Sequence, residues 1–120
     1  MFAHGARDPR WALPFEAVAA RVRARAPEAE VVLSFLEFMT PGLVDAGAAL
    51  VRSGCGDVSV VPLFLGSGGH VRKDLPALLD TLAATHPQVK WSLRQTIGEV
   101  DSVIDAMAHA AVQSSDTERP

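Results

Sequence analysis

The sequence has little of several features that mark whole classes of protein. It contains one cysteine (Cys55), no tyrosine and only 6% aromatic residues. A single cysteine excludes an internal disulfide and fits a reducing compartment. No apolar run approaches the roughly 18 residues that span a bilayer, and Met1–Gly5 has neither the basic nor the apolar region of a signal peptide. We therefore expect a cytoplasmic protein without a membrane partner.

Charge and length narrow the possibilities further. The formal net charge of −3 provides no basic excess, so nucleic acid is not an expected partner. A chain of 120 residues is enough for one hydrophobic core. A content of 48% apolar and 21% charged residues is ordinary for a globular domain. We predict a single domain over residues 1–112, followed by a polar, disordered tail over residues 113–120.

Apolar runs alternate with segments of helical spacing along the chain, which predicts an α/β fold. We expect three layers (αβα), with helices on both faces of a four-stranded parallel sheet in the order 2-1-3-4. The first strand has only three residues before His4, so a natural start upstream of Met1 is one interpretation. The predicted strands lie at Met1–Ala3, Val31–Phe38, Val58–Leu65 and Val89–Leu93.

Proline and capping residues predict the helix boundaries. We expect the first helix to begin near Pro14, after a loop or isolated turn over Asp8–Leu13, and to end at Pro27. Capping residues predict the next two helix starts, at Thr40 followed by Pro41 and at Asp74. Apolar spacing predicts a fourth helix from about Glu99 to Val112.

Three residues with metal-ligating side chains stand 33 positions apart: His4, Glu37 and His70. One strand–loop–helix unit occupies about that length, so parallel units would bring all three side chains to the carboxyl edge of the sheet, within roughly 10 Å. Imidazole with carboxylate suits cobalt, iron, nickel or zinc. Three protein ligands leave coordination positions open, and neutral histidines can also accept protons.

Basic residues and a small-residue loop flank these three positions. The loop Gly66-Ser67-Gly68-Gly69 lacks bulk, so a broad planar molecule can approach its backbone. Arginine binds carboxylates bidentately, and a local basic rim attracts anions despite a negative net charge. The candidate ligand-binding side chains of this rim are Arg7, Arg10, Arg72 and Lys73.

These segments resemble the CbiX/SirB family of class II chelatases, in its short single-domain form. The resemblance implies a chelatase-like, flavodoxin-like half domain that inserts Co²⁺ or Fe²⁺, or alternatively Ni²⁺, into sirohydrochlorin for cobalamin or sirohaem synthesis. It further implies that His4 and His70 handle the metal and the pyrrole protons, with Glu37 as the acidic member, in a homodimer with a shared cleft and no organic cofactor. Ala6 departs from the serine common there. The matching segments are His4-Gly5-Ala6-Arg7-Asp8-Pro9, Phe35-Leu36-Glu37, Pro62-Leu63-Phe64-Leu65 and Gly68-Gly69-His70-Val71-Arg72-Lys73-Asp74-Leu75-Pro76.

Two other functions are compatible with parts of the pattern. The glycine loop suggests phosphoryl transfer, although the Gly-Lys-Ser/Thr ending of a P-loop is missing. A non-catalytic carrier of metal or tetrapyrrole on the same fold is the stronger alternative. We interpret His86 and His109 as surface residues and Cys55 as an incidental thiol. The alternative role of the four basic side chains is to keep the loops soluble.

Overall fold

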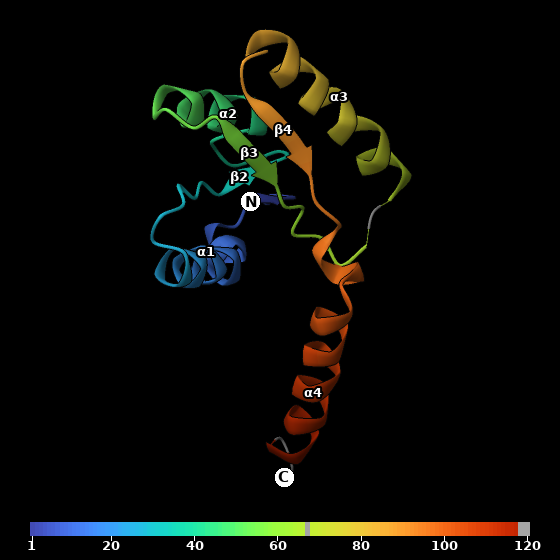
Figure 1. Cartoon of the computed structure of the whole chain (residues 1–120). Helices are drawn as coiled ribbons and strands as arrows, with labels where there is room; N and C mark the ends of the chain where they lie inside the picture. Colours follow the sequence, from blue (N-terminus) through green and yellow to red (C-terminus); the bar gives the residue numbers. More distant parts are fainter. Residues whose placement is uncertain (67, 118–120) are drawn as a thin grey trace.

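The computed structural model describes residues 1–66 and 68–117, apart from the side chains of residue 70 and of residues 114–117. The strands lie in the middle of the molecule, with α1 on one side and α2 and α3 on the other (Figure 1). In chain order, the elements are β1 (Phe2–Ala3), the 3₁₀ helix η1 (Pro9–Ala12), α1 (Leu13–Arg25), β2 (Ser34–Phe35), α2 (Leu43–Arg52), β3 (Asp57–Val60), α3 (Gly69–Thr85), β4 (Lys90–Leu93), the 3₁₀ helix η2 (Ile97–Glu99) and α4 (Asp101–Thr117).

The strands pair in parallel, as their alternation with helices predicts. β1 pairs with β2, with Phe2 opposite Ser34, and β3 pairs with β4, with Asp57 opposite Lys90. One isolated parallel bridge, between Phe2 and Pro62, places β1 beside the chain that follows β3. Over the described residues these pairings form two sheets of two strands each, so a continuous four-stranded sheet is not confirmed.

All four strands are shorter than the apolar runs that predict them, β2 and β3 by the most. The run Val31–Phe38 contributes only Ser34–Phe35 as strand, because its partner β1 is itself only two residues long. Beyond β3 the chain stays hydrogen-bonded to β1, with the Phe2 N–H donating to the Val61 carbonyl (2.9 Å) and the Leu63 N–H donating to the Phe2 carbonyl (2.8 Å). This contact holds the carboxyl ends of β1 and β3 at the same edge.

An apolar core forms on each face of the strands, because successive strand residues point to opposite faces. Phe2 belongs to the core beneath α2 and α3, while Ala3 and Phe35 belong to the core beneath η1 and α1. The buried members of the first core are Phe2, Leu43, Val60, Phe64, Leu75 and Leu82, and those of the second are Ala3, Ala12 and Phe35. Helices on both faces agree with the layered α/β fold predicted from the sequence.

The last helix, α4, extends away from both cores (Figure 1). Its large apolar side chains are strongly exposed: Ile104 by 47%, Met107 by 39% and Val112 by 66%. The helix continues to Thr117, beyond the end predicted at Val112. In the part of the chain that the structure describes, α4 and the other helices lack the combination of length and apolarity that a bilayer span needs.

The predicted start of the second helix is wrong. Thr40 and Pro41 are joined by a cis peptide bond, and α2 begins only at Leu43, with Gly42 as its N-cap. The physical reason lies in β2, since the Phe35 N–H donates to the Pro41 carbonyl (2.9 Å) and Phe35 forms a parallel bridge with Gly42. Residues 41–42 are therefore extended beside the strand instead of opening a helix.

The predicted cap of the third helix is also wrong, because α3 begins at Gly69 with Gly68 as its N-cap. The Arg72 N–H donates to the Gly68 carbonyl (3.1 Å), so a helical turn has already closed before Asp74. Pro76 lies inside the helix. This early start has a functional consequence, since it places residue 70 in the first turn of α3. The first helix agrees with prediction, as α1 follows the 3₁₀ turn η1.

Candidate functional site

His4 and Glu37 lie together at the carboxyl ends of β1 and β2. His4 directly follows β1. Glu37 follows β2 with one residue, Leu36, between them. The backbone continues the strand pairing past the two strands, because the Glu37 N–H donates to the His4 carbonyl (3.1 Å). The two side chains converge, with 3.7 Å between His4 Nδ1 and Glu37 Oε1. The structure therefore brings these two predicted residues to one point.

Gly5 fixes the backbone around this pair. Its φ of +92° lies in the region that glycine adopts without strain. A Cβ built on Gly5 would collide with the carbonyl oxygen of Glu37, so the two backbone segments can only be this close with glycine at position 5. The Glu37 carbonyl also accepts a hydrogen bond from the Met39 N–H (2.8 Å). Glu37 is thus held in a tight turn pressed against the loop that carries His4.

The geometry leaves the Glu37 carboxylate available to a ligand. His4 Nδ1 also lies 3.4 Å from the Gly5 carbonyl oxygen, so it can bind an ion in the tautomer that carries its proton on Nε2. A separation of 3.7 Å between Nδ1 and Oε1 is too long for a hydrogen bond, so neither group saturates the other. Two ligands about 2.1 Å from a tetrahedral ion stand roughly 3.4 Å apart, so one ion can reach both atoms after a small adjustment. The side chains are 50% and 48% exposed. The ring of His4 rests edge-on near Phe64, with centroids 6.3 Å apart.

The third predicted member of the site, His70, is placed only by its backbone. It is the second residue of α3, and its side chain lies outside the described part of the structure. Within the described side chains, no group of three histidine, cysteine, aspartate or glutamate residues is close enough to hold a metal. The structure thus supplies a two-residue centre from His4 and Glu37.

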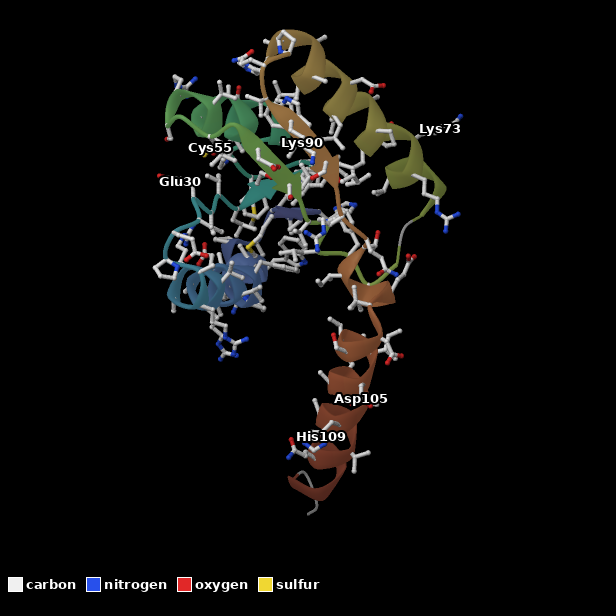
Figure 2. All side chains as sticks on the ribbon, viewed as in Figure 1. Glu30, Cys55, Lys73, Lys90, Asp105 and His109 are labelled. Atoms are coloured by element: carbon white, nitrogen blue, oxygen red, sulfur yellow. The ribbon has the colours of Figure 1, made fainter. Side chains whose placement is uncertain are left out.

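The predicted basic rim divides into different local environments. Arg10 is engaged by Asp8, with Nη2 3.0 Å from Oδ2, so it closes the turn before η1. Hydrogen bonds from the side chain and the backbone of Arg10 lower the pKa of the Asp8 carboxyl. Figure 2 shows Lys73 pointing outward from α3 into solvent. Arg7 lies over the ring of Phe38, 5.0 Å from its centroid, within the range of a cation–π contact.

The glycine loop and Arg72 complete the predicted set. Ser67 lies outside the described residues, while Gly68 and Gly69 form the N-cap and first residue of α3. A Cβ on Gly68 or Gly69 would meet nothing within 4 Å, so this backbone is accessible to a ligand. Arg72 lines a cavity of about 160 Å³ between α3 and the chain after β4.

The larger cavities lie elsewhere. Two grooves of about 320 and 340 Å³ run along α1 and share Glu16, Phe35 and Thr40 in their walls. Neither is lined by His4 or Glu37. The half-exposed side chains of His4 and Glu37 can be approached by a ligand larger than a metal ion.

Two residues near this edge were not identified from the sequence. Phe38 has a φ of +66° and a side chain that is 58% exposed, unusual on both counts for phenylalanine. Arg94 follows β4 and lines the same cavity as Arg72. The sequence holds no signal for Phe38, whereas Arg94 could have been found by extending the rule of polar residues at strand ends to the fourth strand.

Comparisons with known proteins agree with the fold. Residues 1–114 match the CbiX family. The sirohydrochlorin ferrochelatase of Bacillus subtilis (strain 168) is 32% identical over 64% of this chain, and the sirohydrochlorin cobaltochelatase of Methanococcoides burtonii is 30% identical over 63% of it. The aligned region spans only 30% of the length of the first relative and 58% of the second.

Solved structures show the same architecture. The crystal structure of a CbiX protein assigned to cobalamin (vitamin B12) biosynthesis in Marinobacter aquaeolei VT8 matches with a TM-score of 0.83 and 30% identity, over 97% of this chain and 92% of that one. SirB from Bacillus subtilis with Fe³⁺ matches with a TM-score of 0.80 and 27% identity, over 99% of this chain but 46% of SirB. The family match across nearly the whole sequence, supported by these structures, shows that the chain belongs to the CbiX family.

Proposed function

We propose that this protein inserts a divalent metal ion into the tetrapyrrole sirohydrochlorin and releases two protons. The supporting observation is the His4–Glu37 centre, which is half-exposed at the carboxyl edge of paired parallel strands. Ligands of open α/β sheets bind outside that edge. The relatives named as sirohydrochlorin chelatases make this macrocycle the substrate that fits the family.

Metal insertion requires the ion to be held while two pyrrole N–H groups lose their protons. In our proposal the neutral imidazole of His4 and the carboxylate of Glu37 bind the incoming ion and then accept protons from the ring, acting as general bases. Holding the ion and the macrocycle in register removes much of the entropic barrier. We assign the same metal and proton role to His70, from its position in the first turn of α3.

The predicted basic rim and glycine loop supply the substrate contacts in this proposal. Sirohydrochlorin carries eight carboxylates, which suit arginine and lysine side chains. Gly68 and Gly69 offer backbone that no side chain blocks. The remaining proposed substrate contacts are Arg7, Arg10, Ser67, Arg72 and Lys73.

The choice of metal stays a proposal at the level of ligand chemistry. A histidine–carboxylate pair suits Fe²⁺, Co²⁺ and Ni²⁺ alike, and cellular supply decides among ions of similar affinity. The relatives include a ferrochelatase and cobaltochelatases. Insertion of iron would serve sirohaem synthesis and insertion of cobalt would serve cobalamin synthesis. We also propose that strands β2, β1, β3 and β4 act as one sheet in that order.

We propose a homodimer as the working form, with a second copy covering α4. Helices in proteins gain most of their stability from packing an apolar face, and α4 leaves Ile104, Met107 and Val112 exposed. SirB, which matches 99% of this chain with only 46% of its own length, has room for a second unit of the same size. A second copy would supply that missing half.

The test is an anaerobic mixture of purified protein, sirohydrochlorin and Co²⁺, Fe²⁺ or Ni²⁺, followed by its visible spectrum. We expect insertion with at least one ion, and a loss of about 100-fold or more for His4→Ala, the size typical of a general base. His86→Ala is the matched control, because this histidine follows the last residue of α3, at the opposite end of that helix from residue 70. Metal binding without accelerated insertion would instead favour the carrier function.

A further inference from the structure

The cavity between α3 and the chain after β4 is lined by two arginines, both of them exposed to solvent. Its volume is about 160 Å³, and Arg72 and Arg94 both line it. Leu75, which is only 4% exposed, and Pro62 contribute apolar walls. Among the described side chains, neither arginine has a carboxylate partner. A small cavity with apolar walls and two unpaired cations is suited to an anion carried on a short aliphatic arm.

The backbone holds both arginines at the edge where His4 lies. The Arg94 N–H donates to the Val60 carbonyl (2.9 Å), which extends the pairing of β3 and β4 by one residue and fixes Arg94 at the carboxyl end of β4. Arg72 is in the first turn of α3. Pro62, in the cavity wall, bridges Phe2 only two residues before His4. The cavity therefore lies beside the proposed metal centre.

We propose that this cavity is a subsite for one carboxylate arm of the macrocycle, with Arg94 as a substrate-binding residue alongside Arg72. This inference rests on the proposed function. Sites for whole drug-sized ligands measure about 300–1,000 Å³, so 160 Å³ is too small for the ring. It is several times the roughly 30 Å³ that a water molecule occupies, which is enough for an acetate or propionate side chain. Anchoring one arm there leaves the ring outside, facing His4.

The chemistry of the two side chains supports a carboxylate over other ligands. Guanidinium presents a planar fork of donors that matches the two oxygens of a carboxylate. A carboxylate bound at the mouth of the cavity would be within reach of two arginines, whose side chains are free to turn toward it because both are exposed. The hydrocarbon part of the arm would contact Leu75 and Leu93, which also line the cavity. An inorganic anion would leave these apolar walls unused.

The experiment compares Arg94→Ala and Arg72→Ala with Arg52→Ala, in the full-length chain. Arg52 is a matched control, because it ends α2 at the opposite edge of the strands and removing it deletes the same charge. Binding of metal-free sirohydrochlorin is measured by fluorescence quenching, and steady-state kinetics give KM and kcat. We expect Kd and KM to rise about tenfold for each cavity variant, as losing a charged hydrogen bond implies, with kcat and the Co²⁺ affinity unchanged.

Arg94→Lys separates charge from shape, and we expect it to recover only part of the lost affinity, because lysine lacks the fork. The inference is overturned if Arg94→Ala and Arg52→Ala bind the macrocycle equally well, or if Arg94→Ala lowers kcat with KM and Kd unchanged. Wild-type protein that binds sirohydrochlorin without inserting metal would refute the proposed function, while the same titrations would still decide the subsite. Unaltered circular dichroism of each variant ensures that the comparison is made on folded protein.

Discussion

Replacing Gly5 with alanine tests whether the approach of the two strand-end loops builds the site. Two penalties add in this variant. An alanine held at positive φ costs about 1–2 kcal/mol, and the collision of its Cβ with the Glu37 carbonyl forces a backbone shift that costs about another 1–3 kcal/mol. Their sum, roughly 3 kcal/mol, is a large share of the 5–15 kcal/mol by which domains are stable.

Gly54 provides the control that separates these penalties. Its φ is +94°, nearly equal to the +92° of Gly5, yet a Cβ built there meets nothing within 4 Å. Gly54→Ala should therefore cost only the conformational penalty, about 1 kcal/mol. Urea unfolding of both variants measures the difference, which we expect to be about 2 kcal/mol. Equal destabilisation of the two variants would refute the close-approach argument.

The same pair of variants reports on function. In Gly5→Ala the relief of the clash must move Glu37 away from the His4 loop, so we expect insertion activity to fall by about tenfold or more, as misplacement of reacting groups implies. Gly54→Ala, at the end of α2, should keep wild-type activity. Activity is measured at a temperature where both variants are fully folded. A fully active Gly5→Ala would show that the backbone contact does not position the centre.

Three further predictions concern packing, pH and assembly. Gly47→Ala should destabilise the fold in urea by about 1–3 kcal/mol despite its better helix propensity, because its Cβ would lie 2.6 Å from Leu82 Cδ2; a more stable variant would contradict this packing. The Asp8 carboxyl, followed by NMR, should titrate below its usual pKa of about 3.9, and its pKa should return toward that value in Arg10→Ala. Because folding lowers this pKa, the small stabilisation is present above the unfolded pKa and is lost as the pH falls through the folded pKa. Ile104→Asp should shift micromolar protein from dimer to monomer in sedimentation, and an unchanged dimer would exclude this face of α4 as the interface.

Local patterns in the sequence were sufficient for the order of elements and for the proximity of His4 to Glu37. Alternating apolar runs identified four parallel strands, and β-branched residues such as Val58 and Val60 lie buried in β3 as expected. The family resemblance, carried by the two histidine segments, is confirmed by the match over residues 1–114. Strand ends and family motifs are short-range signals, so one sequence is enough to read them.

Features that depend on distant contacts were not predictable in this way. Thr40 and Pro41 have a helix-start pattern, but hydrogen bonding of Phe35 to the Pro41 carbonyl keeps them extended. Arg94 was missed because its place beside Arg72 depends on the register of β3 with β4. In each case a partner elsewhere in the chain decides what a residue does.

The equal spacing of His4, Glu37 and His70 has two different origins. Phe2 lies opposite Ser34, and continuing this register places Gly5 beside Glu37, so the first interval follows from strand pairing. The bridge between Phe2 and Pro62, continued in the same way, places His4 beside Phe64, which agrees with the 6.3 Å between their rings. His70 lies six residues past that partner, on a helix and not at a strand end. Residue 70 lies in the first turn of α3 because this helix starts at Gly69. The metal role that we propose for His70 therefore depends on where α3 begins, and a change that delayed its start should impair insertion while leaving the His4–Glu37 pair intact.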